Sequence, residues 1–350
     1  MPQPQDYTVG IFCPLPIEAS AVQHLLDEIH HKTQSIGIRY ISGKLSGHNI
    51  VVATLPFTSR GKVVTAIAAS QLKSDFPNIS HLLLVGIGGG IPSQDADIRL
   101  GDVVISTPSG SHPGVVQYDL GKRYRGKFER TGHLAAPPEE WLLAISQMKT
   151  DRPSRRDTLA QSIAALQDRC GRQHFMRPPP ETDTLFLPNY NHPVGEATCH
   201  QCTPSQAIQR PIRPNPTTPA IHYGLILSGD SVIKNADERD QISNSIGNAL
   251  CFEMEAAGMM NHFPCLVIRG ICDYADSHKN DIWHEYAATA AAAVAKEVLG
   301  YIEPTQPLER HDLVGANTPE CDAVFSGIFN AQNGKINNIH TISSQGSVYL

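Results

Sequence analysis

The sequence lacks long hydrophobic runs, an excess of basic residues and a recognisable export signal. No apolar stretch approaches the roughly 18 residues that a membrane-spanning helix needs, so we expect no membrane partner. Lysine and arginine number 28 against 34 aspartate and glutamate residues, a net charge of −6, which argues against a nucleic-acid partner. The start has no basic segment followed by an apolar one, so we expect a cytoplasmic protein with eight reduced cysteines. Collagen, coiled-coil, membrane and small secreted classes are excluded.

Strand and helix signals alternate along much of the chain. With 350 residues, 41% of them apolar, the chain can bury a sizeable core. The pattern predicts an α/β fold with a central mixed, mostly parallel twisted sheet flanked by helices. We expect strands at 7–12, 36–45, 48–55, 81–85, 102–105, 222–228 and 265–269, and helices at 18–29, 62–72, 252–262 and 283–299.

Composition changes near residue 150 and again after residue 303. Residues 151–220 hold 11 of the 26 prolines, which predicts a partly irregular, proline-rich insertion within one domain spanning 1–303. A linker between two domains is the alternative, but the second half alone is too small for an independent sheet. We expect a polar tail at 304–350. Its last part, 322–350, is almost uncharged and β-prone, which is typical of cross-β segments or of an unstructured tail.

A glycine-rich segment, Gly86-Ile87-Gly88-Gly89-Gly90, directly follows an expected strand. Glycines let a ligand approach the backbone closely and expose N–H donors. The spacing matches neither a dinucleotide-binding fingerprint nor a phosphate-binding P-loop. A tight turn that binds nothing is the simpler alternative.

Acidic residues occur where strands end or helices begin. Glu253 and Glu255 bracket Met254, and a carboxylate there can accept hydrogen bonds from two neighbouring hydroxyls, as on a ribose; helix-dipole stabilisation is the alternative. Asp273 follows a buried strand, at the edge where α/β sheets bind ligands. It can donate a proton if its surroundings raise its pKa, or it can cap a helix. Glu18 follows the first strand and is expected at the same edge.

Taken together, these motifs resemble the purine nucleoside phosphorylase and uridine phosphorylase superfamily. The likeness is greater to its methylthioadenosine/S-adenosylhomocysteine nucleosidases, and greatest to the related domains at the N-terminus of fungal NLR-type and ankyrin-repeat proteins. Matching segments follow the family's order: VGIFCPLPIEASAV (9–22), SRGKVVTAIAASQL (59–72), LLLVGIGGGIP (82–92), GDVVIS (101–106), YGLILSGDSVIK (223–234), CFEMEAAG (251–258) and CLVIRGICDYADSHKN (265–280).

This resemblance implies a purine N-glycosidase that needs no cofactor. It implies that Asp273 protonates N7 of the departing purine, that Glu255 binds the ribose hydroxyls above Met254, and that Glu18 positions the attacking water. The remaining residues that it implies for substrate binding are Gly86, Ile87, Gly88, Gly89, Ser228, Gly229, Phe252, Glu253, Arg60 and Trp283.

Departures from the family pattern bear on the nucleophile. Leu84 stands where phosphorylases of the family carry a phosphate-binding arginine, and Ile87 where they often carry serine or threonine. We therefore expect hydrolysis, with phosphorolysis left open because Arg60 can compensate. Cys272 replaces a serine common in the nucleosidases, which leaves a nucleoside-binding pseudoenzyme as a further alternative.

Five basic residues between 122 and 130 suggest 5′-phosphorylated substrates such as ATP, if that segment covers the site; a solvated loop is the alternative. The fungal likeness implies a homo-oligomer that acts as an immune or cell-death effector. A signalling module whose tail, 322–350, assembles with an NLR-type partner is another reading of the same likeness.

Cys199 and Cys202 have the CxxC spacing of zinc sites, and His192 lies close by in sequence, as do Cys170 and His174. A single CxxC pair is weak support, so zinc and free thiols both stay open.

Overall fold

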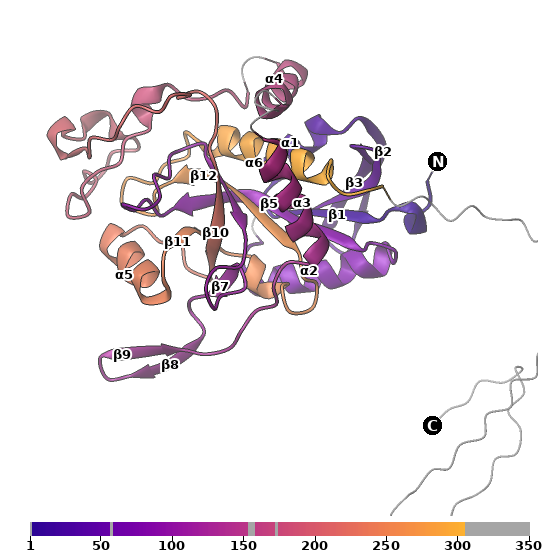
Figure 1. Cartoon of the computed structure of the whole chain (residues 1–350), viewed down its shortest axis with the longest axis horizontal. Helices are drawn as coiled ribbons and strands as arrows, with labels where there is room; N and C mark the ends of the chain where they lie inside the picture. The colour runs from indigo at the N-terminus through magenta and orange to yellow at the C-terminus, as the bar shows by residue number, and fades with distance from the viewer. Residues whose placement is uncertain (1, 57–58, 153–157, 172–173, 305–350) are drawn as a thin grey trace, which may run out of the picture. The chain divides into compact units, whose positions relative to one another are not determined.

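The structure is a computed structural model that describes residues 2–56, 59–152, 158–171 and 174–304 (Figure 1). Within this part, one ten-stranded sheet has the order β11-β10-β6-β12-β5-β1-β4-β3-β2, with β7 paired to β10. Its strands are β1 (Val9–Cys13), β2 (Glu28–Ser35), β3 (Ile38–Leu45), β4 (His48–Thr54), β5 (His81–Gly90), β6 (Val103–Ser106), β7 (Val115–Gln117), β10 (Ile221–Ser228), β11 (Ala249–Glu253) and β12 (Leu266–Asp273). Parallel and antiparallel pairs both occur, which confirms the mixed α/β sheet.

One half of the sheet closes on itself. Strand β11 pairs with β10 on one side and antiparallel with β5 on the other, so β5, β12, β6, β10 and β11 form a ring. Gly89 is central to this closure because it is in register with Phe252 of β11 and with Asp273 of β12. The ends of β11 and β12 are thereby held on the two sides of β5.

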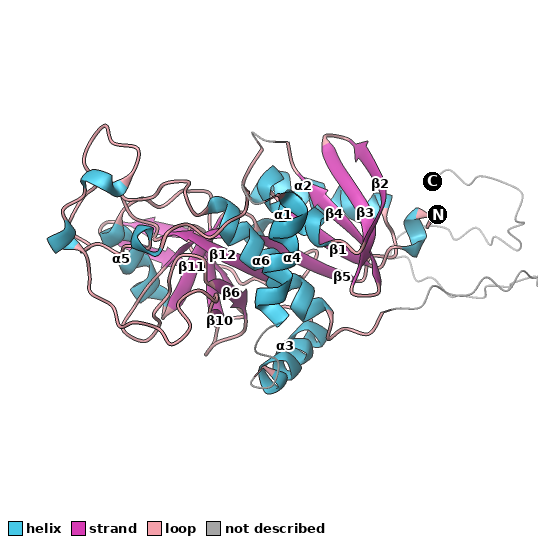
Figure 2. Cartoon of the chain, turned by 90° about the horizontal axis from the view of Figure 1, so that it is seen from above, coloured by secondary structure: helices cyan, strands magenta, loops and turns pink. Residues whose placement is uncertain are grey.

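Helices cover the sheet. They are α1 (Pro16–Leu25), α2 (Lys62–Asp75), α3 (Glu139–Asp151), α4 (Thr158–Cys170), α5 (Ala236–Ile246) and α6 (His284–Leu299). Helix α6 packs along β5 and β12 and also contacts α1, α3 and α4 (Figure 2). A Cβ atom on Gly270 would lie 1.9 Å from the Ala287 carbonyl oxygen, so the bare backbone of β12 lets the alanine-rich helix lie directly on it.

Two expectations about local structure are wrong. The helix expected at 252–262 is absent from the described chain, where Phe252 and Glu253 end β11 and only a short 3₁₀ helix, η5 (Ala256–Gly258), follows. The glycine-rich segment is not a turn but the second half of β5, because its backbone pairs with β12 and β11. Tertiary pairing thus overrides local sequence preference in both places.

The proline-rich segment 151–220 combines α4 with three 3₁₀ helices, η2 (Pro180–Thr182), η3 (Cys199–Gln201) and η4 (Pro204–Gln206); a further 3₁₀ helix, η1 (Pro4–Asp6), lies near the N-terminus. The expectations for the tail, including 322–350, fall outside the described residues. Among the described helices, none is long and apolar enough to cross a membrane.

Candidate active site

A cavity of about 590 Å³ opens where β5, β11 and β12 end. Its lining residues are Leu15, Pro16, Ile17, Glu18, Arg60, Ile87, Gly88, Gly89, Ser231, Val232, Ile233, Lys234, Phe252, Glu253, Met254, Glu255, Arg269, Cys272, Asp273, Ala275, Lys279, Asp281 and His284. The three acids for which the resemblance implied catalytic roles, Glu18, Glu255 and Asp273, therefore face one space.

The first acid, Glu18, is fixed by the first turn of α1. Pro16 begins that helix, and the Glu18 carboxylate turns back to accept a hydrogen bond from the Leu15 N–H at 2.7 Å. Its other oxygen accepts from the Ile87 N–H of β5 at 2.8 Å. The side chain is almost fully buried, so helix and strand together hold this carboxylate at the cavity wall.

Arg269 is the charged centre of the site. It lies in the middle of β12 with 1% of its surface exposed. Its Nη2 is 2.5 Å from Glu253 Oε2 and 3.2 Å from Glu255 Oε2, and its Nη1 is 3.9 Å from Glu18 Oε1. One buried guanidinium thus faces three carboxylates, which limits the cost of burying them.

The two neighbouring glutamates differ in what they contact. The Glu253 carboxylate accepts from the backbone N–H groups of Glu255 and Ala256 at 3.1 and 2.9 Å, in addition to its pair with Arg269. These contacts hold the 3₁₀ turn that carries Glu255. Glu253 therefore orients its neighbour, whereas the Glu255 carboxylate contacts Arg269 and the backbone of Met254 and Gly61.

The third acid, Asp273, is the last residue of β12. Its Oδ1 accepts from the Ala275 N–H at 2.8 Å, and its Oδ2 accepts from the Cys272 thiol at 3.0 Å and from the Lys279 ammonium. Cys272 thus donates to the Asp273 carboxylate even though it stands where the nucleosidases of the family often carry serine. Lys279 adds a buried ion pair at the same oxygen.

Electrostatics separate the acids. Burial raises the pKa of Glu18 to about 7, with the Arg269 charge acting against this rise and Glu255 adding to it. Burial likewise raises the pKa of Glu255 against the Arg269 charge. Burial also acts to raise the pKa of Asp273, but Lys279 and the Cys272 thiol lower it below its usual range. A raised pKa, the condition under which the sequence predicts that Asp273 can donate a proton, is therefore not met in this structure, and the carboxylate form is favoured.

Most of the residues implied for substrate binding line the cavity: Arg60, Ile87, Gly88, Gly89, Phe252, Glu253 and Met254. Gly86 lies just outside this lining, where a Cβ atom would be 2.4 Å from Glu18 Oε1 and 2.5 Å from Arg269 Nη1. Its missing side chain makes room for this charged pair.

Three of the implied residues lie elsewhere. The Ser228 hydroxyl is buried and accepts from the Ala257 N–H at 2.9 Å, so it braces η5. Gly229 packs on the Tyr118 ring. The Trp283 indole is buried and donates to Thr182 Oγ1 at 3.1 Å. These residues contribute to packing around the site rather than to its lining.

Cationic residues were missed at the sequence level. Arg269, Lys279, Lys234 and His284 all line the cavity. Arg269 could have been recognised from the sequence. It is a lone charge in an apolar strand that is expected to be buried, and such a charge requires an acidic partner. The other three lie on loops or at the start of α6, where sequence gives no such signal.

The basic segment at 122–130 does not line the cavity. It forms an antiparallel hairpin of β8 (Gly121–Tyr124) and β9 (Lys127–Arg130), whose side chains are largely exposed. In Figure 1 this hairpin projects from the body of the described chain. The condition that this segment covers the site is therefore not met in this structure, and the alternative of a solvated basic segment describes it better.

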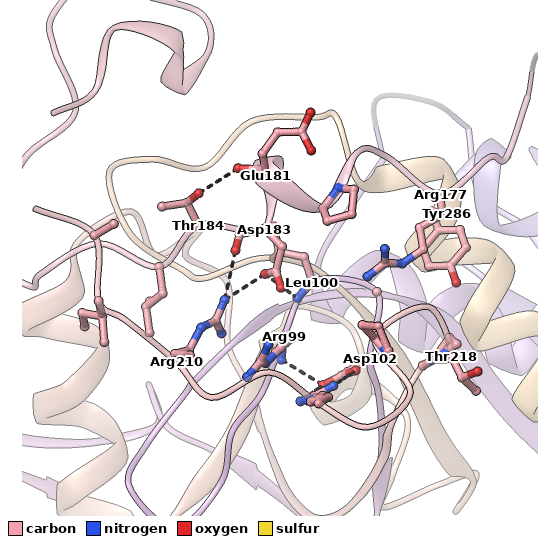
Figure 3. A pocket seen from close by; sticks show the side chains of 18 of the residues that line it. Arg99, Leu100, Asp102, Arg177, Glu181, Asp183, Thr184, Arg210, Thr218 and Tyr286 are labelled. Carbon is pink, nitrogen blue, oxygen red and sulfur yellow. Dashed lines mark hydrogen bonds and ion pairs between the residues drawn. The ribbon is translucent and has the colours of Figure 1, made fainter. Parts of the chain in front are cut away.

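A second cavity, of about 300 Å³, lies between residues 99–102, which precede β6, and residues of the segment 177–219 (Figure 3). Two of its arginines are paired with acidic residues of the protein. Arg213 Nη1 is 2.7 Å from Asp102 Oδ1, and Arg210 Nη2 is 3.1 Å from Asp183 Oδ1. These pairs tie the proline-rich segment to the sheet, so we assign this cavity a structural role.

Two groups of potential metal ligands occur in the described chain, each with ligand atoms within 4.8 Å of one another. One group is Cys272, Asp273 and His284. In this group the Asp273 carboxylate already accepts a hydrogen bond from the Lys279 ammonium. The other is His192, Cys199 and Cys202, as the sequence suggested. Cys170 and His174 are not part of it.

Known proteins of similar sequence and fold identify the family of this chain. Residues 8–303 match the model of the phosphorylase superfamily. An NLR-like protein of Hyaloscypha variabilis is 41% identical over 324 residues, which cover 90% of this chain and 31% of that protein. The ATP nucleosidase Cap17 of Escherichia coli is 24% identical over 308 residues, 83% of this chain and 51% of its own length.

Among solved structures, an S-adenosylhomocysteine nucleosidase from Streptococcus pyogenes in complex with 5-methylthiotubericidin has a TM-score of 0.56 at 18% identity. It aligns with 85% of this chain and 98% of its own. The chain spans about a third of the NLR-like relative and half of Cap17. A family match over most of its length, together with the ring-closed sheet, shows that this chain belongs to the phosphorylase superfamily.

Proposed function

We propose that this chain hydrolyses the N-glycosidic bond of purine nucleosides or nucleotides and releases the free base. The observation that carries this proposal is the single cavity onto which Glu18, Glu255 and Asp273 converge from α1, η5 and β12. Breaking this bond places positive charge on the sugar and negative charge on the base. Carboxylates stabilise the first charge, and protonation of the base relieves the second.

Each acid has a distinct part in the proposed reaction. Asp273 gives a proton to N7 of the purine as the bond to the anomeric carbon breaks. Glu255 accepts hydrogen bonds from the ribose hydroxyls. Water adds to the anomeric carbon, and Glu18 takes the proton that the water loses. One proton leaves the enzyme and one returns, so a complete turnover needs no cofactor.

Lys279 determines when Asp273 can act as an acid. Its ammonium contacts Asp273 and favours the carboxylate. A purine whose N7 approaches this oxygen takes the place of the ammonium. Burial, the largest influence on this carboxyl, then raises its pKa and favours the protonated form.

Water, rather than phosphate, is the proposed nucleophile. Leu84, at the position of the phosphate-binding arginine in the phosphorylases, has 0% of its surface exposed and cannot reach an anion. The Ile87 N–H of the glycine-rich strand is already bonded to Glu18. A dianion at this place would face a carboxylate instead of a donor.

Nucleotides are the favoured substrate class, because Arg60 and Lys234 are exposed cations on the cavity lining. Cations at a rim suit a 5′-phosphate chain, whereas an alkylthio group prefers apolar surroundings. The name of Cap17 as an ATP nucleosidase agrees with this choice. The NLR-like relative supports an effector role, and homo-oligomerisation and a partner-binding tail at 322–350 remain part of the proposal.

Chromatography of products tests the proposal. Adenosine, inosine, methylthioadenosine, AMP and ATP are incubated with the protein, with and without phosphate. We expect free base at a rate that phosphate does not change, with ATP and AMP preferred. Asp273→Asn abolishes release, whereas Asp237→Asn, on an exposed position of α5, leaves it unchanged. No base from any substrate, with a protein that still unfolds cooperatively, refutes the proposal; ribose 1-phosphate would establish phosphorolysis instead.

A further inference from the structure

The described loop 185–208 is closed at its neck but has little core of its own. Backbone hydrogen bonds join Leu187 to Gln206 at 2.9 Å and Ile208 to Leu185 at 2.8 Å. Between these ends the chain contains short 3₁₀ turns, and Cys202, with 8% of its surface exposed, is one of its few buried residues. Such a loop cannot be ordered by apolar burial alone.

Three soft ligands meet inside this loop. The ring nitrogen of His192 and the sulfur atoms of Cys199 and Cys202 lie within 4.8 Å of one another. A tetrahedral zinc ion with ordinary bond lengths separates such ligands by about 3.5–3.8 Å, so small side-chain movements complete the geometry. His192 and Cys199 are seven positions apart in sequence, so the fold, and not the CxxC spacing alone, brings the imidazole to the thiols.

A candidate for a fourth ligand, His278, lies on the neighbouring loop, outside the group of three whose ligand atoms are within 4.8 Å of one another. His278 is 7% exposed, and both of its ring nitrogens lack a hydrogen-bond partner among the described residues. Its ring stacks on Phe186 at 4.2 Å and lies 5.4 Å from the His192 ring. Its Nδ1 is 3.7 Å from Asp276 Oδ1. A carboxylate beside one ring nitrogen orients a histidine so that the other can bind a metal.

We propose that His192, Cys199, Cys202 and His278 form a structural zinc site. All four positions are protein ligands, which is typical of structural rather than catalytic zinc. The ion would join the proline-rich segment to the loop that follows β12. Contacts already link the two: His192 N donates to Ser277 Oγ at 3.0 Å, and Cys199 Sγ lies 3.9 Å from the His278 carbonyl oxygen.

The proposed zinc site lies next to the loop that carries Lys279. His278 immediately precedes Lys279, which contacts Asp273. A metal bound at His278 would therefore limit the movement of the loop that carries this lysine. It would order the active site from outside, without touching the substrate or supplying chemistry.

Zinc analysis of the full chain, purified without chelators or a metal-binding tag, tests the proposal. We expect about one zinc per chain. The double variant Cys199→Ser/Cys202→Ser loses it and unfolds at lower temperature, whereas Cys170→Ser, on α4, retains it. Less than about a tenth of an equivalent in the unaltered protein, or a Cys199–Cys202 disulfide by thiol counting, overturns the proposal.

Cobalt substitution examines the ligand set without relying on activity. A Co²⁺-loaded protein should show thiolate-to-cobalt charge transfer and the visible bands of a tetrahedral site. His278→Gln should change these bands and weaken binding by at least about tenfold in competition with a chelator. Unchanged bands and affinity in this variant would remove His278 from the site, and octahedral bands in the unaltered protein would overturn the tetrahedral arrangement.

Discussion

The location of one proton in the active site makes a specific prediction about pH. The proposed reactive complex carries one proton on the pair Glu18 and Asp273, with Asp273 as acid and Glu18 as base. In the unbound protein that proton resides on Glu18, because burial raises the pKa of Glu18 to about 7 while Lys279 lowers that of Asp273. In the proposed reaction, the proton must therefore be on Asp273, and Glu18 must be ionised, once the purine is bound.

The rate constant kcat/KM, which reports the unbound enzyme, should follow the singly protonated form. With a pKa near 7, about nine-tenths of the protein has this form at pH 6 and about one-tenth at pH 8. We expect kcat/KM to fall about tenfold between these values, with no loss between pH 5 and 6. The shift in the Glu18 pKa from 4.5 corresponds to roughly 3 kcal/mol.

The assay is initial-rate adenine release at low substrate concentration from pH 5 to 9, with the same series for Glu18→Gln. This variant should lose about 10²–10⁴ in kcat and no longer show a step near pH 7. A kcat/KM that rises from pH 6 to 8 refutes the shared proton and assigns Glu18 as an ionised base in the unbound protein. Retention of the step in Glu18→Gln would assign it to another group.

Three further predictions concern residues around the acids. Arg269→Met removes the partner of three buried carboxylates and should lower the free energy of unfolding by about 3–5 kcal/mol at pH 8. The loss should be smaller at pH 5, because burial raises the pKa values of Glu18 and Glu255 and their protonation removes part of the unpaired charge; urea unfolding at both pH values measures it. Lys279→Met should raise the pKa of Asp273, because it removes the ammonium that lowers it; an acidic limb of kcat/KM unchanged from the unaltered protein would contradict this. Gly86→Ala should displace Glu18 and lower kcat about 10²-fold with the protein still folded by circular dichroism. A Gly86→Ala protein with unchanged kcat would show that Glu18 and Arg269 can move aside without loss of activity.

The sequence predicted the acids better than their surroundings. Glu18 and Asp273 were recognisable because each is an acid next to a strand end, and parallel strands bring such ends together. Lys279 was not recognisable from the sequence. It lies on the loop after β12, and no helical or strand periodicity relates its position to that of Asp273. Not all residues that were implied only by the resemblance line the cavity. The Ser228 and Trp283 side chains face the protein interior. Side chains alternate between the two faces of a strand and rotate around a helix, so a shift of one residue changes the face that a side chain occupies.

The helix expected at 252–262 shows a second limit. Local sequence, rich in Met, Glu and Ala, favours a helix, but Phe252 pairs with β5 across Gly89. That pairing joins residues far apart in the chain, and the local sequence around residue 252 contains no signal that predicts it. Likewise, the glycines of β5 could be recognised as unusual, yet only the neighbouring strands decide that they form a strand instead of a turn.

The register at Gly89 fixes the distance between the two strands that flank β5 at the cavity. Phe252 and Asp273 sit on the strands either side of it, so their backbones are two strand spacings apart, roughly 10 Å. Peptide hydrogen bonds set this width, and side-chain substitutions leave it unchanged. If Asp273 binds the base and the end of β11 lies beside the sugar, as proposed, the distance between these two parts of the site is fixed by the backbone. Differences in substrate preference are then expected along the strand direction, where Arg60 and Lys234 line the cavity.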